Sequence, residues 1–443
     1  MSFPLLSDIL EFTRDGEWGK GEPADGLVKM GVIRGTDFSK IRRGDFSTIP
    51  VRYIPKKAAD RKTLRPRDIL FETAGGTKDQ PTGRSVFLKR EFFDEYPYPL
   101  TCASFSRFLR VGKGPITPEY LFWYLQFLWS ERLIYQYHIQ HTGVARFQYT
   151  QFASEQTIPV LESANQDAIS GLLGALDDKI ELNRRMSATL EEMAQALYRS
   201  WFVDFDPVHA RALGQPPAHM DATTAALFPD SFGPGGLPKG WEMSTIGEVA
   251  ETVGGATPKT KEPAFWDGPH RWATPRGLSK LGQPILFETD RTLTDAGLAK
   301  VSSGLSPAGT VLLSSRAPIG YVAIAQNPVA VNQGFIALRE TDRISSVEAY
   351  FWVQSNLDAI LANANGSTFQ EISKKNFRPL PCVVAPDPVR SAFRDLAGTW
   401  FDRVAGLCAE SANLAALRDT LLPRLMSGEL RIREAEKQVE EVV

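Results

Sequence analysis

Apolar residues repeat every seven positions between Asn165 and Trp201, the longest periodic stretch of the chain. The two neighbouring lines of this repeat hold Ile169, Leu173, Leu176, Ile180, Asn183, Ser187, Leu190, Ala194, Leu197 and Trp201. A second, weaker repeat between Pro388 and Ser427 holds Phe393, Trp400, Leu407, Leu414 and Leu421. Each apolar stripe is narrow, and neither helix can bury its stripe alone. The pattern predicts two long helices that pair antiparallel as a coiled coil over ~50 Å, at ~1.5 Å per residue.

Polar residues interrupt the first stripe at Asn183 and Ser187. Buried polar side chains in such a seam cost stability and commonly fix the register of the two helices. We favour that interpretation. The alternative is that they mark where the second helix diverges, because Arg403 and Glu410 also approach its stripe.

The two halves of the chain repeat each other outside the helices as well. Three motifs recur in the same order: Leu64, Pro66 and Ile69 as Leu305, Pro307 and Val311; Glu119, Phe122 and Trp123 as Glu348, Phe351 and Trp352; Phe147, Gln148 and Pro159 as Phe369, Gln370 and Pro381. A repeat this long is no solenoid. It indicates a duplicated unit of one globular domain and one long helix, related by an approximate two-fold axis.

The fold class we predict is mixed α/β (α+β), with two globular domains and two long antiparallel helices. The expected segments are a first domain at 1–150, a first helix at 155–206, a linker at 207–238, a second domain at 239–378, a second helix at 385–430 and a tail at 431–443. The linker is rich in Pro, Gly and Ala and has no core of its own.

Composition limits the function classes. The 443 residues carry a formal net charge of only −2, so nucleic-acid binding by bulk charge is not expected and local patches would have to supply it. One such patch lies between Lys40 and Arg67. The three cysteines have no paired spacing, which argues against disulfides and zinc and fits a reducing compartment. With no secretory leader and no membrane-length apolar run, we expect a cytoplasmic protein without membrane contact.

Catalytic motifs are missing from the sequence. It contains no GxxxxGK[ST], GxGxxG, HExxH or GxSxG pattern, and its five histidines are too scattered to predict one metal site. We therefore predict no catalytic residues, no metal and no cofactor bound by this chain.

Several motifs carry a family resemblance. They are Leu190–Val208, Met220–Phe232, Gly254–Pro258, Val331–Phe335 and Leu417–Leu430. Together they resemble the specificity subunits of type I restriction-modification systems, and the resemblance covers nearly the whole chain. It implies a noncatalytic subunit in which each domain reads one half of an asymmetric bipartite DNA sequence while the helices set the gap. It also implies two DNA methyltransferase subunits that use S-adenosylmethionine and, where a restriction partner is present, a translocating nuclease that uses ATP and Mg²⁺.

Candidate DNA contacts lie in polar loops, where paired donors and acceptors can reach double-stranded DNA. In the first domain we expect base contacts from Lys78, Gln80, Thr82 and Arg84, and phosphate contacts from Arg42, Arg43, Lys56 and Lys57. In the second we expect Lys259, Thr260, Lys261, Arg276 and Arg316, with Asn332 and Gln333 as structural or base-contacting amides. Partner contact is expected at the end of the first helix, at Tyr198, Arg199, Phe202 and Phe205.

The first domain departs from the family pattern. It lacks a GGTP-like opening, and Cys102–Phe105 only faintly resembles the NQGF segment of the second domain. Two other functions stay open at this point: a coiled-coil scaffold that joins two protein-binding domains, and an enzyme with an unrecognised site, such as a nuclease.

Overall fold

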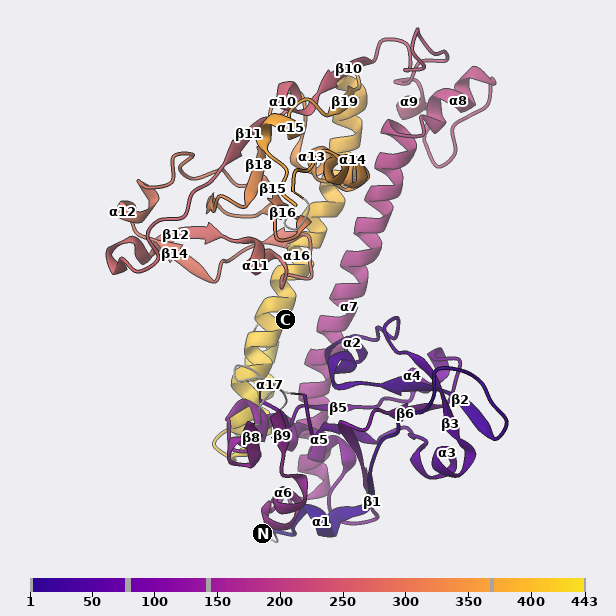
Figure 1. Cartoon of the computed structure of the whole chain (residues 1–443), viewed down its shortest axis with the longest axis vertical. Coiled ribbons are helices and arrows are strands. Elements are labelled where there is room, and N and C mark those ends of the chain that lie inside the picture. The colour runs from indigo at the N-terminus through magenta and orange to yellow at the C-terminus, as the bar shows by residue number, and fades with distance from the viewer. Residues whose placement is uncertain (1–2, 76–80, 141–144, 367–369, 442–443) are drawn as a thin grey trace. The chain divides into compact units, whose positions relative to one another are not determined.

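The structure, a computed structural model, describes residues 3–75, 81–140, 145–366 and 370–441. The chain forms two compact units: unit 1 comprises residues 1–181 and 412–443, and unit 2 comprises residues 182–411. The long helices α7 (Ser163–Phe202) and α16 (Asp387–Met426) each run through both units (Figure 1). Each unit therefore consists of one globular domain and half of each long helix.

Unit 1 is built on two main sheets. Four antiparallel strands follow the order β1-β7-β4-β5, with bounds Leu10–Asp15, Ser106–Val111, Ile69–Glu72 and Ser85–Phe87. The second sheet has the order β3-β2-β6, with bounds Val51–Pro55, Leu27–Ile33 and Leu100–Cys102. In it, β2 pairs antiparallel with β3 and parallel with β6. The remaining elements are α1 (Leu6–Ile9), η1 (Gly35–Asp37), α2 (Phe38–Ile41), α3 (Lys56–Lys62), α4 (Glu91–Glu95), α5 (Pro118–Ser130), η2 (Tyr135–Tyr137), β8 (His138–Gln140), β9 (Ala145–Phe147), α6 (Tyr149–Glu155) and α17 (Ile432–Glu440).

Unit 2 is built in the same way. Its five-stranded sheet has the order β11-β18-β15-β16-β13, with bounds Glu251–Gly254, Phe335–Arg339, Val311–Ser315, Ile319–Ala325 and Ile285–Leu286. Its three-stranded sheet has the order β14-β12-β17, with bounds Arg291–Leu293, Trp266–Ala273 and Val329–Val331. The remaining elements are α8 (Asp206–Ala212), α9 (Ala222–Ala225), β10 (Glu242–Thr245), α10 (Ile246–Val249), η3 (Pro263–Phe265), α11 (Pro275–Leu278), α12 (Asp295–Leu298), α13 (Ser346–Ser355), α14 (Leu357–Ala362), α15 (Lys374–Phe377) and β19 (Pro381–Val384).

Helix α13 joins the sheet of unit 2 to the long helices, and Figure 1 shows it between β15–β16 and α16. The helix begins at a capping box, in which Ser345 and Glu348 each accept a hydrogen bond from the other's backbone N–H. Its Phe351 ring packs 5.4 Å from the Phe401 ring of α16, measured between centroids. The Tyr350 hydroxyl donates to Glu191 of α7 at 2.6 Å. Apolar packing and this hydrogen bond thus fix the domain of unit 2 to its halves of both helices.

The two units share one topology, which confirms the internal repeat. The order β1-β7-β4-β5 recurs as β11-β18-β15-β16, and the mixed sheet β3-β2-β6 recurs as β14-β12-β17 with the same strand directions. One residue pairing drawn from the sequence is wrong. The N–H groups of Phe147 and Ile372 donate to the equivalent carbonyls of Thr73 (2.9 Å) and Ser315 (3.0 Å), so Ile372 is the counterpart of Phe147. Phe369 lies outside the described residues.

Two glycines mark the equivalent close approach in each unit. A Cβ atom on Gly16 would lie 1.8 Å from the Cys102 carbonyl oxygen, and one on Gly255 would lie 1.7 Å from that of Val331. Neither distance leaves room for a side chain. The first domain therefore does have a counterpart of the GGATP opening at Gly16, and the turn at 103–105 occupies the place of 332–334.

The predicted helix stripe is buried in unit 1. Ile169, Leu173 and Leu176 of α7 lie in one apolar core with Leu414 and Leu421 of α16. Ile180, also expected in the seam, is only half-buried. Helix α7 begins at Ser163 rather than near 155, because Thr157 pairs with Leu5 and Pro159 follows in the extended segment.

In unit 2 most predicted stripe positions are buried, including Phe393 and Leu407, but at some positions a neighbouring residue is more deeply buried. Leu190, Leu197 and Trp400 are only half-buried, whereas Tyr198 and Phe401, each next to a predicted position, lie in the core. The cause is helix geometry: a straight helix has 3.6 residues per turn, so a strict seven-residue repeat drifts around its surface.

A polar pair lies in the seam of unit 2. Asn183 is fully buried, and its side-chain N–H donates to Glu410 at 2.9 Å. Further along, the Tyr198 ring packs 5.8 Å from the Phe393 ring. Asn183 of α7 contacts Glu410 of α16, and the later residue Tyr198 contacts the earlier residue Phe393. The two helix halves of unit 2 are therefore antiparallel. A buried pair of this kind supports the interpretation that Asn183 fixes the register.

Among the described residues, no helix combines the length and the apolar character that a membrane span requires.

Candidate DNA-binding surface

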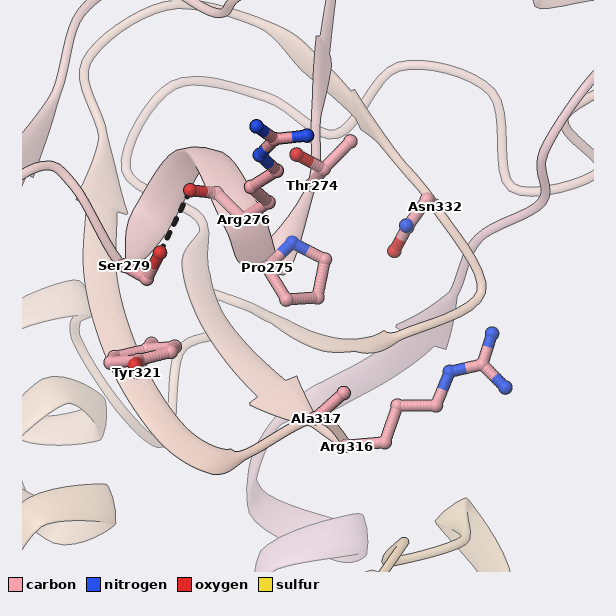
Figure 2. A pocket seen from close by; sticks show the side chains of 8 residues that line it. All are labelled: Thr274, Pro275, Arg276, Ser279, Arg316, Ala317, Tyr321 and Asn332. Atoms are coloured by element: carbon pink, nitrogen blue, oxygen red, sulfur yellow. Dashed lines mark hydrogen bonds between the residues drawn. The ribbon is translucent and has the colours of Figure 1, made fainter. Parts of the chain in front are cut away.

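A pocket of about 360 Å³ opens in unit 2 where three segments meet (Figure 2). The segments are α11, the turn between β15 and β16, and the start of the turn between β17 and β18. The lining residues are Thr274, Pro275, Arg276, Ser279, Arg316, Ala317, Tyr321 and Asn332. Figure 2 shows Arg276 extending from one side and Arg316 from the other. We call this site the two-arginine pocket.

Local sequence shapes the walls of the pocket. The Thr274 hydroxyl accepts a hydrogen bond from the Gly277 N–H at 3.1 Å, and Pro275 occupies the first helical position, so α11 starts where Arg276 projects. On the opposite wall, the Asn332 side-chain oxygen accepts from the Gly334 N–H at 2.8 Å. This bond uses the amide oxygen and leaves the amide N–H₂ as the polar group that Asn332 can offer to a ligand.

Two groups lie next to the Arg316 side chain. Its guanidinium lies 3.7 Å from the Glu371 carboxylate. A Cβ atom on Gly334 would lie 3.4 Å from Arg316 Nε and 3.0 Å from Pro275 Cγ, so the missing side chain of Gly334 leaves the space between these two walls. The backbone of Ala317 next to Arg316 has φ +57°, a strained conformation for a residue with a side chain.

Three of the second-domain residues that we selected from the sequence meet in this pocket: Arg276, Arg316 and Asn332. The others lie outside its lining. The Thr257 hydroxyl donates to the Gln333 amide oxygen, and the exposed residues Lys259, Thr260 and Lys261 follow β11 in a loop of their own. Thr274, Ser279 and Tyr321 were missed, because nothing in their local sequence distinguishes them from ordinary turn and strand residues.

At the equivalent place in unit 1, the described residues form a buried ion pair. Glu72, at the end of β4, is buried with 2% of its side chain exposed and forms a two-bond ion pair with Arg84, at 2.9 and 2.5 Å. Arg84 also donates to the Gly35 carbonyl at 3.1 Å. In unit 2 the end of β15 carries Ser314 instead of a carboxylate. The two units thus share a framework and present different polar groups on it.

Phe105 is a second difference that sequence reasoning missed. It occupies the turn position of Gly334, and 60% of its surface is exposed. Aligning the repeat through Gly16 and Gly255 would have identified it. Nearby in unit 1, the Arg52 guanidinium lies 4.7 Å from the centre of the Trp18 ring, a cation–π contact.

The structure corrects two of the first-domain candidates and leaves others as predictions. Thr82 is buried, and its N–H donates to the His138 ring at 3.2 Å, so it has no surface to offer to a base. The Arg42 guanidinium is bound by Asp177. Lys56 and Lys57 are exposed on α3, and Arg43 is exposed beside Arg42. Lys78 and Gln80 lie outside the described residues.

Asp177 on α7 is the centre of a charged cluster in unit 1. It accepts hydrogen bonds from Arg42 at 2.6 Å and from Arg418 of α16 at 2.5 Å. Burial alone would lower the pKa of Arg418, but Asp177 and Asp419 outweigh it and the net shift is upward. These contacts connect three elements far apart in the sequence. Arg42, from which we expected a phosphate contact, is therefore bound within this cluster.

Replacing Asp177 with Asn is expected to lower the free energy of unfolding of unit 1 by about 3 kcal/mol, because Arg42 loses its carboxylate partner and Arg418 keeps only Asp419. Urea denaturation of the full chain measures this change. Asp178→Asn is the matched control, since Asp178 pairs with Lys89 at an exposed position and should change stability by less than about 1 kcal/mol. Equal urea midpoints for Asp177→Asn and Asp178→Asn would contradict the stabilising role of the Asp177 cluster.

The expected partner contacts at the end of α7 also need correction. Tyr198 and Phe202 are buried in the core of unit 2, where the Phe202 ring packs 5.1 Å from the Phe393 ring. Phe205 packs 5.6 Å from Trp241, and only Arg199 is exposed, in an ion pair with Asp204. The density of aromatic residues here reflects the core of unit 2.

Within the part of the chain that the structure describes, no three His, Cys, Asp or Glu side chains come together as a metal site would require.

Comparison with known proteins defines the class of unit 2 first. Residues 238–384 match the family described as type I restriction modification DNA specificity domain. This range contains the two-arginine pocket and both sheets of unit 2. The family match therefore lies within unit 2.

Similarity extends over most of the chain. It is 25% identical over 427 residues to the type I restriction enzyme HindI specificity subunit of Haemophilus influenzae, covering 86% of this chain and 90% of that one. It is 36% identical over 156 residues to the MjaIX specificity subunit of Methanocaldococcus jannaschii, covering 35% and 36%. The solved S subunit of a type I restriction-modification system from M. genitalium has the same fold, with a TM-score of 0.54 at 14% identity over 96% of this chain and 95% of that one. Over most of its length the chain is thus similar to specificity subunits of type I restriction-modification systems, and it shares the fold of a solved one.

Proposed function

We propose that units 1 and 2 each read one half of an asymmetric, bipartite DNA sequence. The observation that carries the proposal is the pair of equivalent surfaces: the same sheets and turns present an open two-arginine pocket in unit 2 and the Glu72–Arg84 pair beside Phe105 in unit 1. Two domains that share a fold but present different polar side chains are suited to recognise two different half-sites. A scaffold for two protein-binding domains would give no reason for a DNA specificity domain.

The long helices have the second role in this proposal, which is to set the number of base pairs between the half-sites. Each has 40 residues and is continuous through both units, about 60 Å at ~1.5 Å per residue. A continuous helix pair is stiff enough to act as a spacer.

Chemistry is assigned to partners. We propose that the chain acts with two DNA methyltransferase subunits that use S-adenosylmethionine, and with a restriction subunit that uses ATP and Mg²⁺ where one is present. A net charge of −2 suits a chain whose partners supply part of the phosphate neutralisation.

The purified chain alone is expected neither to methylate nor to cut DNA. Incubation with S-adenosylmethionine and plasmid DNA, with a known adenine methyltransferase as the positive control, measures this. The proposal predicts in addition that deleting the gene removes one asymmetric, interrupted motif from the methylated adenines of the cell. Methyl transfer by the isolated chain, or an unchanged methylation map, would overturn the proposal.

A further inference from the structure

The polar groups of the two-arginine pocket are mostly hydrogen-bond donors. None of its eight lining residues is acidic, and it offers the guanidinium groups of Arg276 and Arg316. Asn332 adds its amide N–H₂, because its oxygen is already used by the Gly334 N–H. The Ser279 hydroxyl donates to the Arg276 carbonyl at 2.9 Å, so it too is engaged locally. A ligand that fits this set must present at least two acceptors.

Arg316 has an acidic neighbour. The Glu371 carboxylate lies 3.7 Å from its guanidinium, and a Cβ atom on Gly334 would lie 3.4 Å from its Nε. A carboxylate beside an arginine can orient its planar guanidinium group. A two-bond contact with a base requires such an orientation, whereas a contact with a phosphate does not. Glu371 is thus a positioning residue for Arg316.

We infer that the two-arginine pocket takes the major-groove edge of a guanine in the half-site read by unit 2, with Arg316 donating to N7 and O6. This inference rests on the proposed function and adds the base and the residue to it. Guanine is the base whose major-groove edge carries two adjacent acceptors, and arginine is the side chain that matches them with two donors. Arg276, on the opposite wall, supplies a further donor to the same base step.

The equivalent place in unit 1 provides the contrast. There the carboxylate of Glu72 binds Arg84, and Arg84 also donates to the Gly35 carbonyl, so these polar groups of unit 1 are paired with one another. The inference therefore predicts a change in only one of the two half-sites when the pocket is altered.

The test uses the full-length chain assembled with its methyltransferase subunits and a pool of random duplex DNA. Arg316→Lys keeps the charge and removes the fork, so preference for guanine at one base pair of one half-site should fall about 5- to 150-fold. Arg276→Lys tests the opposite wall and should weaken preference at the same base step. Arg343→Lys is the matched control, because Arg343 is equally exposed (34% against 36% of the side chain) and also pairs with a glutamate.

A chemical change in the DNA tests the same contact without altering the protein. Replacing each guanine of the half-site in turn with 7-deazaguanine removes the N7 acceptor. At one position the wild-type complex should lose binding, whereas Arg316→Lys, which has already lost the contact, should lose little more. In the half-site read by unit 1, each 7-deazaguanine should have the same effect on binding by the wild-type complex and by Arg316→Lys.

Three results would overturn the inference. The first is a half-site for unit 2 without a guanine at any position. The second is a substitution of Arg316 that lowers affinity equally for all sequences and reduces the salt dependence by about one ion, as for a phosphate contact. The third is a loss of binding to 7-deazaguanine DNA that is the same for wild type and variant. A wild-type complex that selects no bipartite sequence would instead refute the proposed function.

Discussion

Inserting one heptad into both long helices is expected to lengthen the gap between the two half-sites by about three base pairs. Seven residues add about 10.5 Å at ~1.5 Å per residue, and one base pair rises ~3.4 Å. The structure shows where to insert: after Glu181 in α7 and after Ser411 in α16, where the helices pass from one unit to the other. These places leave Asn183 and Glu410 in register, whereas an insertion after Leu407 would move Glu410 away from Asn183.

A map of methylated sites for each variant measures the change. The half-site bases should stay the same, and some activity should be lost because three base pairs rotate the DNA by about 100°. A four-residue insertion in both helices should add roughly two base pairs and cost more stability, because it shifts the seam. An insertion in α7 alone is the control and should mismatch the two stripes. Stable, active variants that still methylate only the original spacing would show that the helices do not set the distance.

A fragment of residues 1–206 is expected to self-associate and to direct methylation to a symmetric, interrupted sequence. The fragment lacks residues 412–443, which supply Leu414, Leu421 and Leu422 to the core of unit 1. Without these residues the apolar stripe of α7 is exposed to water, which favours its burial against another helix. By the repeat, the end of α7 in a second copy carries Tyr198 and Trp201 where α16 carries Leu422 and Leu425, so a second copy can supply the missing half-helix.

Analytical ultracentrifugation measures the association, and methylation mapping with the methyltransferase partner measures the recognised sequence. Leu173→Glu in the fragment is the control, because Leu173 is fully buried in the stripe and a charge there should block pairing. A monomeric fragment, or one that still directs methylation to the asymmetric site of the full chain, would contradict the paired-helix interpretation.

The sequence determined the elements whose signal is local. A seven-residue apolar repeat is a property of one helix, so both ends of α7 and α16 could be located to within eight residues. The repeat of motifs was also sufficient to predict two related domains. Three polar residues chosen from loops, Arg276, Arg316 and Asn332, do meet in one pocket.

Contacts between distant residues could not be predicted in this way. Arg42 and Arg84 look alike in the sequence as basic residues, but Asp177 binds one and the buried Glu72 binds the other. An ion pair depends on where two separate segments of the chain are brought together, and composition contains no record of that. The buried position of Thr82 was hidden for the same reason.

Local periodicity by itself therefore determined the two helices, their stripes and the duplicated organisation of this chain. Only the tertiary structure decided which residue next to a stripe position is buried. Tyr198 is buried where Leu197 is half-buried, because a helix has 3.6 residues per turn and α13 packs against this part of the helices. It also decided which partners the polar groups of the two equivalent surfaces have, since Glu72 at the end of β4 pairs with Arg84 in unit 1, whereas Arg276, Arg316 and Asn332 line a pocket in unit 2.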